Sequence, residues 1–243
     1  MQRPARPTIY LFDIDGTLVD TAGAGRRALA LAFERRYGRA DGLDFSFDGM
    51  TDRAIVAIGL AALQPHGLVD AWASREAKQA EIDALLEGYV EALRREVEAE
   101  AHRFVVYEGV SHAVDLVRER AEGVVGLGTG NIRKGAALKL EAVGLYERFA
   151  FGGFGCDHED RAQLLAVGAA RGAALLGRDV SDCRVLVIGD TPKDVAAAHA
   201  IGARCLGVAT GRFGVAELKQ AGADHVADSL ATAEARRALV SVA

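Results

Sequence analysis

Three short polar turns hold the residues of this chain that are best suited to chemistry, and each turn follows an apolar run. One such turn would be weak evidence for a site, because turns favour Asp and Gly for conformational reasons alone. Three turns in succession, each after an apolar run, favour one shared functional site. The turns are Asp13-Ile14-Asp15-Gly16-Thr17, Gly128-Thr129-Gly130-Asn131 and Gly189-Asp190-Thr191-Pro192-Lys193-Asp194.

The carboxylates of the first and third turns predict a metal site. Parallel strands place their carboxyl ends at one edge of a sheet, so Asp13, Asp15 and Asp190 are expected to converge there. Like charges that converge repel one another unless a cation shares the site. These are hard oxygen ligands, and no cluster of His or Cys accompanies them to favour zinc. We therefore expect Mg²⁺ as the cofactor, because it prefers octahedral oxygen coordination.

A metal-bound carboxylate beside a hydroxyl and the free amides of a helix start is typical of phosphate binding. Glycines in two of the turns would let the backbone approach such an anion closely. We expect Asp13 to attack phosphorus and form an aspartyl phosphate. Asp15 would protonate the leaving alkoxide and then activate water. The expected phosphate-binding residues in these turns are Gly16, Thr17, Thr129, Gly130 and Asn131.

The apolar runs and the amphipathic stretches between them alternate as in an α/β protein with a parallel sheet. Strands are expected at 8–12, 124–127 with its flanks, and 184–188, with edge strands at 204–208 and 225–226. Helices are expected at 108–121, 132–143, 159–176, 192–201 and 215–221.

Residues 21–102 contain almost no strand signal. Leu29, Phe33 and Tyr37 recur every four residues, which predicts one core-facing helical stripe. Residues 72–101 form a long charged, alanine-rich stretch that predicts a helix with a solvated face. The expected fold is therefore a doubly wound, Rossmann-like α/β core (1–20 and 104–243) with an inserted all-helical cap (21–103). Within the cap, 45–53 predicts either a turn into a helix or a loop that closes on substrate.

The composition is that of an ordinary soluble globular protein. The 243 residues are 50% hydrophobic and carry a net charge of −5, which disfavours nucleic acid or an anionic membrane as the partner. The three cysteines include no CxxC pair. No secretory signal and no apolar run of about 20 residues is present, so we expect a cytoplasmic protein. Gly126, Gly128 and Gly130 lack the spacing of a dinucleotide-binding fingerprint.

The three turns resemble those of the haloacid dehalogenase superfamily, and in particular its phosphoglycolate-phosphatase-like branch with a helical cap. The similarity extends to Tyr107-Glu108-Gly109-Val110 and Ala221-Gly222-Ala223-Asp224. It implies that Asp13 is the nucleophile, Asp15 the acid/base, Thr129 a phosphate ligand and Asp190 a metal ligand. Asp194 would be a second metal ligand or a partner of one.

The resemblance also implies that part of the cap faces the site, with Thr51, Asp52 and Arg53 as candidate substrate contacts. Members that remove halides lack the aspartate two residues after the nucleophile. Because Asp15 is present here, dehalogenation is disfavoured.

One departure from the family pattern concerns the positive charge that opposes the phosphate. Relatives usually carry a lysine at the start of the helix before the third turn, whereas 155–161 here contains no lysine. Arg161 is the favoured substitute, because its planar fork suits phosphate, and Lys134 is the alternative. His158 lies in an acidic run that favours a helix N-cap over a second metal site.

The predicted function is hydrolysis of a small phosphorylated metabolite, with phosphoglycolate suggested by the resemblance alone. The first alternative is a phosphomutase, in which water is held off the intermediate. The second alternative is a non-catalytic module that keeps phosphoaspartate as a signal. The sequence predicts no oligomeric state.

Overall fold

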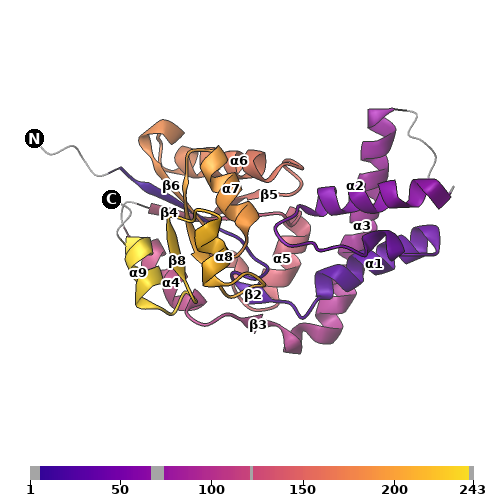
Figure 1. The fold of residues 1–243 in the computed structure, drawn as a ribbon, viewed down its shortest axis with the longest axis horizontal. Coiled ribbons are helices and arrows are strands. Elements are labelled where there is room, and N and C mark those ends of the chain that lie inside the picture. Colours follow the sequence, from indigo (N-terminus) through magenta and orange to yellow (C-terminus); the bar gives the residue numbers. More distant parts are fainter. Residues whose placement is uncertain (1–5, 67–73, 121–122, 241–243) are drawn as a thin grey trace, which may run out of the picture.

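The computed structural model describes residues 6–66, 74–120 and 123–240, and within these ranges the chain forms a parallel sheet with helices on both faces (Figure 1). The sheet has six strands in the order β5-β4-β1-β6-β7-β8. Every neighbouring pair in it is parallel. The strands are β1 (Thr8–Phe12), β4 (Gly123–Thr129), β5 (Phe151–Phe154), β6 (Arg184–Gly189), β7 (Arg204–Val208) and β8 (His225–Ala227).

Strand β1 is buried on both faces, as its continuous apolar run predicts. Ile9 and Leu11 belong to one core cluster, and Tyr10 and Phe12 belong to the other. The first cluster lies under α6 (Arg161–Leu175) and α7 (Pro192–Ala200), with α8 (Val215–Gln220) beside α7. The second lies under α4 (Val110–Arg118), α5 (Arg133–Glu141) and α9 (Ala233–Val240).

The order of the sheet reverses at β1, which is the feature that positions the site. The chain runs from β1 to β4 and β5 on one side, and then to β6, β7 and β8 on the other. Phe12 is level with Leu127 of β4 and with Ile188 of β6. The three polar turns therefore begin side by side, at the point where a doubly wound sheet leaves room for a ligand.

Helices α1 (Ala24–Tyr37), α2 (Asp52–Leu63) and α3 (Arg75–Glu100) pack together beyond the carboxyl ends of the strands (Figure 1). Leu29 and Phe33 are fully buried among them, as the four-residue spacing predicts. The short antiparallel pair of β2 (Val19–Asp20) and β3 (Val105–Val106) forms where the chain leaves the core and returns to it. Short 3₁₀ turns lie at Asp41–Leu43, Gln64–His66, Ala101–Arg103, Tyr146–Arg148 and Val180–Asp182.

The α/β fold class is confirmed, with corrections to individual elements. Strand β7 is an inner strand between β6 and β8, not an edge strand. Strand β5 forms one edge of the sheet and α9 covers the other end, and neither was expected. Residues 72–73 and 121 of two expected helices lie outside the described residues.

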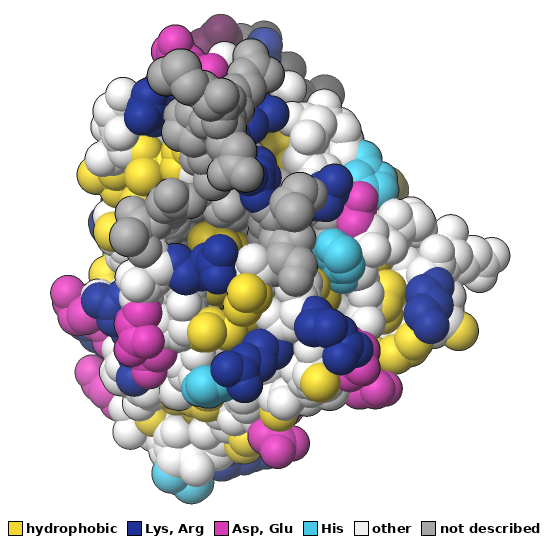
Figure 2. Space-filling view, turned by 90° about the vertical axis from the view of Figure 1, so that its left-hand side faces the viewer, with side chains coloured by type: hydrophobic (Ala, Val, Ile, Leu, Met, Phe, Trp, Pro, Cys, Tyr) yellow, Lys and Arg dark blue, Asp and Glu magenta, His cyan; other side chains and the backbone are white. Residues whose placement is uncertain are grey.

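The face of the molecule opposite the three cap helices carries acidic and basic side chains interspersed with hydrophobic ones (Figure 2). No helix within the described residues is long and apolar enough to cross a bilayer.

Strand β5 depends on a close approach to α6, and this contact gives a test of the fold. A Cβ atom on Gly153 would lie 1.9 Å from the carbonyl oxygen of Leu164 in α6. Gly153→Ala should therefore lower the free energy of unfolding by about 1–3 kcal/mol through overpacking. Gly88→Ala is the matched control, because its nearest neighbour would be Ala32 Cβ at 3.7 Å.

The control substitution in α3 should be neutral or stabilising by up to about 1 kcal/mol, since it removes a helical glycine. Urea unfolding measures both variants. Equal stability of the Gly153 and Gly88 variants would contradict the described packing of β5 on α6.

Candidate active site

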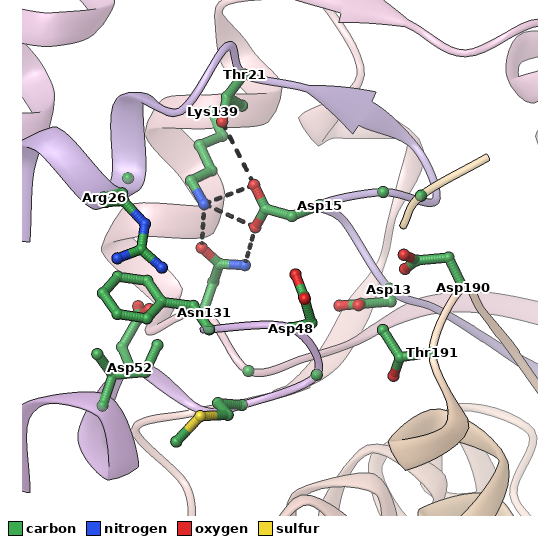
Figure 3. A pocket seen from close by; sticks show the side chains of 18 of the residues that line it. Asp13, Asp15, Thr21, Arg26, Asp48, Asp52, Asn131, Lys139, Asp190 and Thr191 are labelled. Atoms are coloured by element: carbon green, nitrogen blue, oxygen red, sulfur yellow. Dashed lines mark hydrogen bonds and ion pairs between the residues drawn. The ribbon is translucent and has the colours of Figure 1, made fainter. Parts of the chain in front are cut away.

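The carboxyl ends of β1, β4 and β6 border a cavity of about 290 Å³ that the cap helices help to enclose. The amide of Asp13 donates to the carbonyl of Ile188 over 2.9 Å, which continues the β1–β6 ladder by one residue. This bond places the Asp13 side chain at the floor of the cavity. Asp15 and Asp190 also line the cavity, so the structure brings the first and third turns together (Figure 3).

Asp13 is paired with Arg161, the first residue of α6. Arg161 Nη2 lies 2.9 Å from Asp13 Oδ2 and 2.5 Å from Asp194 Oδ1, and its Nε donates to Asp194 Oδ1 over 2.8 Å. The N–H directions of Nη2 meet neither carboxylate as hydrogen bonds, although the charges are in contact. Among the described residues, Nη2 is the buried side-chain polar atom without a hydrogen-bond partner. Arg161 also lines the cavity.

Asp194 is held by both of its carboxylate oxygens. Oδ2 accepts hydrogen bonds from the amide and the hydroxyl of Thr191, over 3.0 and 2.7 Å, which completes a capping box at the start of α7. Oδ1 accepts from Arg161. Asp194 thus fixes Arg161 and the third turn relative to each other.

Asp190 sits between two backbone segments that come unusually close to it. A Cβ atom on Gly16 would lie 2.3 Å from Asp190 Oδ2, and one on Gly211 would lie 1.8 Å from the same oxygen. Gly16 also has φ of +83°, where a side chain is strained. Thr17 is fully buried and donates its hydroxyl to Asp190 Oδ1 over 3.1 Å. Gly16 and Thr17 therefore accommodate and orient Asp190.

Asp13, Asp190 and Asp194 form the acidic cluster of this site, with one carboxylate oxygen of each within 4.8 Å of the others. All three are buried. One guanidinium cannot neutralise three carboxylates, so the donor set suits a hard divalent cation. Asp15, which was also expected to bind metal, has its carboxylate outside this cluster.

The Asp15 carboxylate is bound instead by Lys139 of α5 and by Asn131. Lys139 Nζ lies 2.8 and 2.7 Å from the two Asp15 oxygens and 2.7 Å from Asn131 Oδ1. Asn131 Nδ2 donates to Asp15 Oδ2 over 2.7 Å. Figure 3 shows these groups converging on Asp15, with Asp13 and Asp190 on its other side.

Burial and charge shift the carboxyl groups in opposite directions. Burial raises the pKa of Asp13 to about 6, although the charge of Arg161 opposes this shift. Burial also raises the pKa of Asp190 to about 8, with Asp194 and Asp13 adding repulsion. Burial acts on Asp15 as well, but the charge and hydrogen bonds of Lys139 and the amide of Asn131 outweigh it and lower the Asp15 pKa. Two neighbouring aspartates thus have distinct proton affinities.

The second turn lies between the core and the cap. Thr129 is fully buried, and its hydroxyl oxygen accepts hydrogen bonds from the backbone and side-chain amides of Asn131, so it orients Asn131. A Cβ atom on Gly130 would lie 2.0 Å from the carbonyl oxygen of Met50. Gly130 is therefore required by the approach of the cap segment.

Two of the three candidate cap residues dock the cap onto the core. Asp52 lines the cavity, and its Oδ2 accepts a hydrogen bond from the amide of Ile132 over 2.8 Å. Thr51 caps α2 and donates to the carbonyl of Glu159 over 2.9 Å. The expected segment 45–53 is thus both the turn into α2 and the loop at the cavity, since Phe47, Asp48, Gly49 and Met50 also line it.

Several expected residues do not line the cavity: Thr17, Thr51, Thr129 and Asp194 are buried, and Arg53 and Lys134 lie elsewhere. Arg53 is directed to α3, where it bonds Asp83 over 2.5 Å and also Gln79, because a helix turns successive side chains by 100° away from Asp52. Lys134 is exposed on α5 and lies outside the cavity lining. His158 takes part in the start of α6 by accepting from the amide of Asp160, the N-cap residue.

Several lining residues were missed in the sequence. Lys139 is 4% exposed on a helix face that otherwise presents Gly135, Ala136 and Leu140. The sequence signal for its burial was a lysine on the same face of a predicted helix as small and apolar residues. Arg26 and Arg212 also line the cavity. They had no such signal, because they come from α1 and from the loop after β7.

Comparison with known proteins identifies the family. The sequence profile of haloacid dehalogenase-like hydrolases matches residues 7–202. Among solved structures, a hydrolase from Pseudomonas syringae is 21% identical with a TM-score of 0.64, covering 97% of this chain and 99% of that one. A predicted phosphoglycolate phosphatase from Haemophilus somnus is 15% identical with a TM-score of 0.66, covering 94% and 97%.

CbbY from Rhodobacter sphaeroides is 19% identical with a TM-score of 0.64, covering 93% of this chain and 96% of that one. Its crystal structures contain phosphate or, in a mutant, xylulose 1,5-bisphosphate. A search of curated proteins gave no match. At these identities the solved structures establish the fold alone, whereas the profile covers most of the chain. The protein belongs to the haloacid dehalogenase-like hydrolases.

Proposed function

We propose that this protein is a phosphatase that hydrolyses a small phosphomonoester through an aspartyl phosphate on Asp13. The observation that carries the proposal is the pairing of the buried Asp13 with Arg161 over 2.9 Å, both of which line the cavity. A nucleophilic carboxylate and a cationic donor at one point are what phosphoryl transfer requires.

Asp13 and Asp15 would divide the reaction between them. Asp13 forms a bond to phosphorus as the bond from phosphorus to the substrate oxygen breaks, and the minor protonated form of Asp15 gives its proton to that leaving oxygen. Water then forms a bond to phosphorus as the bond to Asp13 breaks, and the proton of the water passes to Asp15. Asp15 is suited to this exchange because its side chain is 44% exposed to the cavity.

Asp13 and Asp190 would hold Mg²⁺, since Asp194 has both oxygens bound to Arg161 and Thr191. When bound, the ion neutralises charge on the transferring phosphoryl group. Arg161 binds a phosphate oxygen through Nη2, and Asn131 at the cavity wall keeps Asp15 in place. Thr17 and Thr129 act behind the wall by orienting Asp190 and Asn131.

The volume of the cavity, about 290 Å³, favours a small phosphorylated metabolite. Its wall combines charged groups with apolar ones, among them Arg26 stacked over the ring of Phe47 at 3.7 Å. Phosphoglycolate is the first substrate to test, on the basis of family resemblance.

A screen of phosphorylated metabolites for phosphate release tests the proposal. With Mg²⁺, the wild type should release inorganic phosphate from at least one small phosphomonoester. Asp13→Asn should fall below about one-thousandth of that turnover, because the nucleophile is lost. An active Asp13→Asn variant would refute the mechanism. Conversion of a sugar phosphate to its isomer without phosphate release would instead establish the phosphomutase alternative.

Substitutions of the two candidate cations test which of them opposes the phosphate. Arg161→Ala should abolish turnover, and Arg161→Lys should retain charge but lower kcat/KM by about 10- to 100-fold through loss of the Nη2 donor. Lys134→Ala should keep wild-type kinetics, because Lys134 is exposed outside the cavity. Loss of turnover in Lys134→Ala alone would contradict the assignment of Arg161.

The raised pKa of Asp190 predicts how metal-free protein responds to pH. Its pKa rises from 3.8 to about 8 on folding, so the folded state holds that proton more tightly. Stability should therefore fall as pH rises from about 4 to about 8, where the buried group must ionise. In EDTA, Asp190→Asn should raise Tm more at pH 9 than at pH 5.

The same pair of proteins tests metal binding. Mg²⁺ should raise the Tm of the wild type at pH 8, because a ligand that binds the folded state stabilises it, and should leave Asp190→Asn nearly unchanged. An equal response of the two proteins to Mg²⁺, or equal Tm shifts at both pH values, would show that Asp190 is not the group concerned.

A further inference from the structure

Lys139 is a buried lysine that the packing of α5 does not require. It is 4% exposed and shares the inward face of the helix with Gly135, Ala136 and Leu140. Burying an ammonium is unfavourable unless its charge and its donors are matched, and an apolar residue of similar length would pack there at lower cost. Its presence at this position therefore points to a role in the site.

The donors of Lys139 are all used by the protein itself. An ammonium has three N–H donors, and Lys139 directs them to Asp15 Oδ1, Asp15 Oδ2 and Asn131 Oδ1 at 2.7–2.8 Å. The side-chain amide of Asn131 completes this hydrogen-bond network by donating to Asp15 Oδ2 over 2.7 Å and to Thr129 Oγ1 over 2.9 Å. Lys139 thus has no donor left for a substrate, and any effect it has must pass through Asp15.

The two side chains of this pair differ sharply in exposure. The side chain of Lys139 is 5% exposed, whereas that of Asp15 is 44% exposed. The ammonium thus lies behind the carboxylate, which faces the cavity (Figure 3). The start of α1 closes over it, because a Cβ atom on Gly25 would lie 3.2 Å from Lys139 Nζ. A cap helix and a core helix together confine the ammonium.

We propose that Lys139 is a positioning residue that holds the Asp15 carboxylate at the cavity wall for proton transfer with the substrate oxygen. This inference rests on the proposed function, in which Asp15 is the acid/base. It adds a second clamp to the site: Arg161 holds Asp13, and Lys139 holds Asp15 from a different helix.

The dependence of the rate on the leaving group tests the proposal. A p-nitrophenolate leaving group needs little protonation, whereas an alkoxide needs a proton from Asp15, and general acid help contributes about 10²–10⁴-fold. Lys139→Met should lower kcat/KM for an alkyl phosphate at least tenfold, and kcat/KM for p-nitrophenyl phosphate less than threefold. KM should change little, since Lys139 has no donor for substrate. The comparison uses kcat/KM because this constant reports the steps up to formation of the aspartyl phosphate and not its later hydrolysis.

Two comparisons separate positioning from a general effect on folding. In the Asp15→Asn background, Lys139→Met should cause no further loss with the alkyl phosphate, because both changes remove the same step. Lys219→Met is the matched control, as it makes the same substitution at an exposed site on α8, and it should change neither substrate. Equal losses with both substrates, or an unchanged or faster rate with the alkyl phosphate, would overturn the proposal.

A double-mutant cycle in thermal unfolding examines the clamp independently of turnover. If Lys139 and Asp15 are coupled, Lys139→Met should lower Tm less in the Asp15→Asn background than in the wild type. If the Tm shifts of the two single variants add up in the double variant, Lys139 and Asp15 are not coupled and the proposal is contradicted. Failure of the wild type to hydrolyse either substrate would refute the proposed function instead, and the cycle would still decide whether the clamp exists.

Discussion

Repulsion among carboxylates at one edge of the sheet is the constraint that organises this site. Asp13, Asp190 and Asp194 are buried within 4.8 Å of one another, and Asp15 follows two residues after the first. A buried carboxylate without a partner is destabilising by several kcal/mol. Two cations from the surrounding helices reduce this repulsion: Arg161 at the start of α6 pairs with Asp13, and Lys139 of α5 pairs with Asp15.

The two cations give the two aspartates of the first turn different surroundings. Asp13 is buried, and its raised pKa shows that burial outweighs the charge of Arg161. Asp15 is more exposed, and Lys139 with Asn131 outweighs burial and lowers its pKa. Groups of the same chemical type are thereby separated in proton affinity, with the pKa of Asp13 raised and that of Asp15 lowered in the metal-free protein.

Cap and core meet through backbone contacts that leave little room for side chains. The Met50 carbonyl lies against Gly130, and the amide of Asp52 donates to the Gly130 carbonyl over 2.8 Å. Gly25 of α1 lies against the ammonium of Lys139. The cap thus contacts the same turn and the same helix that hold Asp15, so the position of the cap and the placement of Asp15 are physically linked.

The sequence predicted the fold class and the convergence of the three turns, because buried parallel strands have continuous apolar runs and end in turns at one edge. Strand β5 escaped prediction because Gly152 and Gly153 weaken its strand signal, although Gly153 allows α6 to approach. Arg161 was a candidate because the family resemblance calls for a cation at the start of the helix before the third turn, and its planar fork suits phosphate. Lys139 was not, because its role depends on a tertiary contact with a residue 124 positions away.

The cap contacts were harder to predict for the same reason. Arg53 and Asp52 are adjacent in the sequence, but only the packing of α2 on α3 decides which of the two faces the cavity. The separation into core and cap at residues 20 and 104 stays a prediction.

The most direct measurement is mass spectrometry of the protein quenched in acid during turnover of a small phosphomonoester with Mg²⁺. We expect a phosphoryl adduct on the peptide that contains Asp13, formed in the wild type and absent in Asp13→Asn. An adduct on a different residue, or turnover of substrate with no adduct at any time before the steady state, would contradict it.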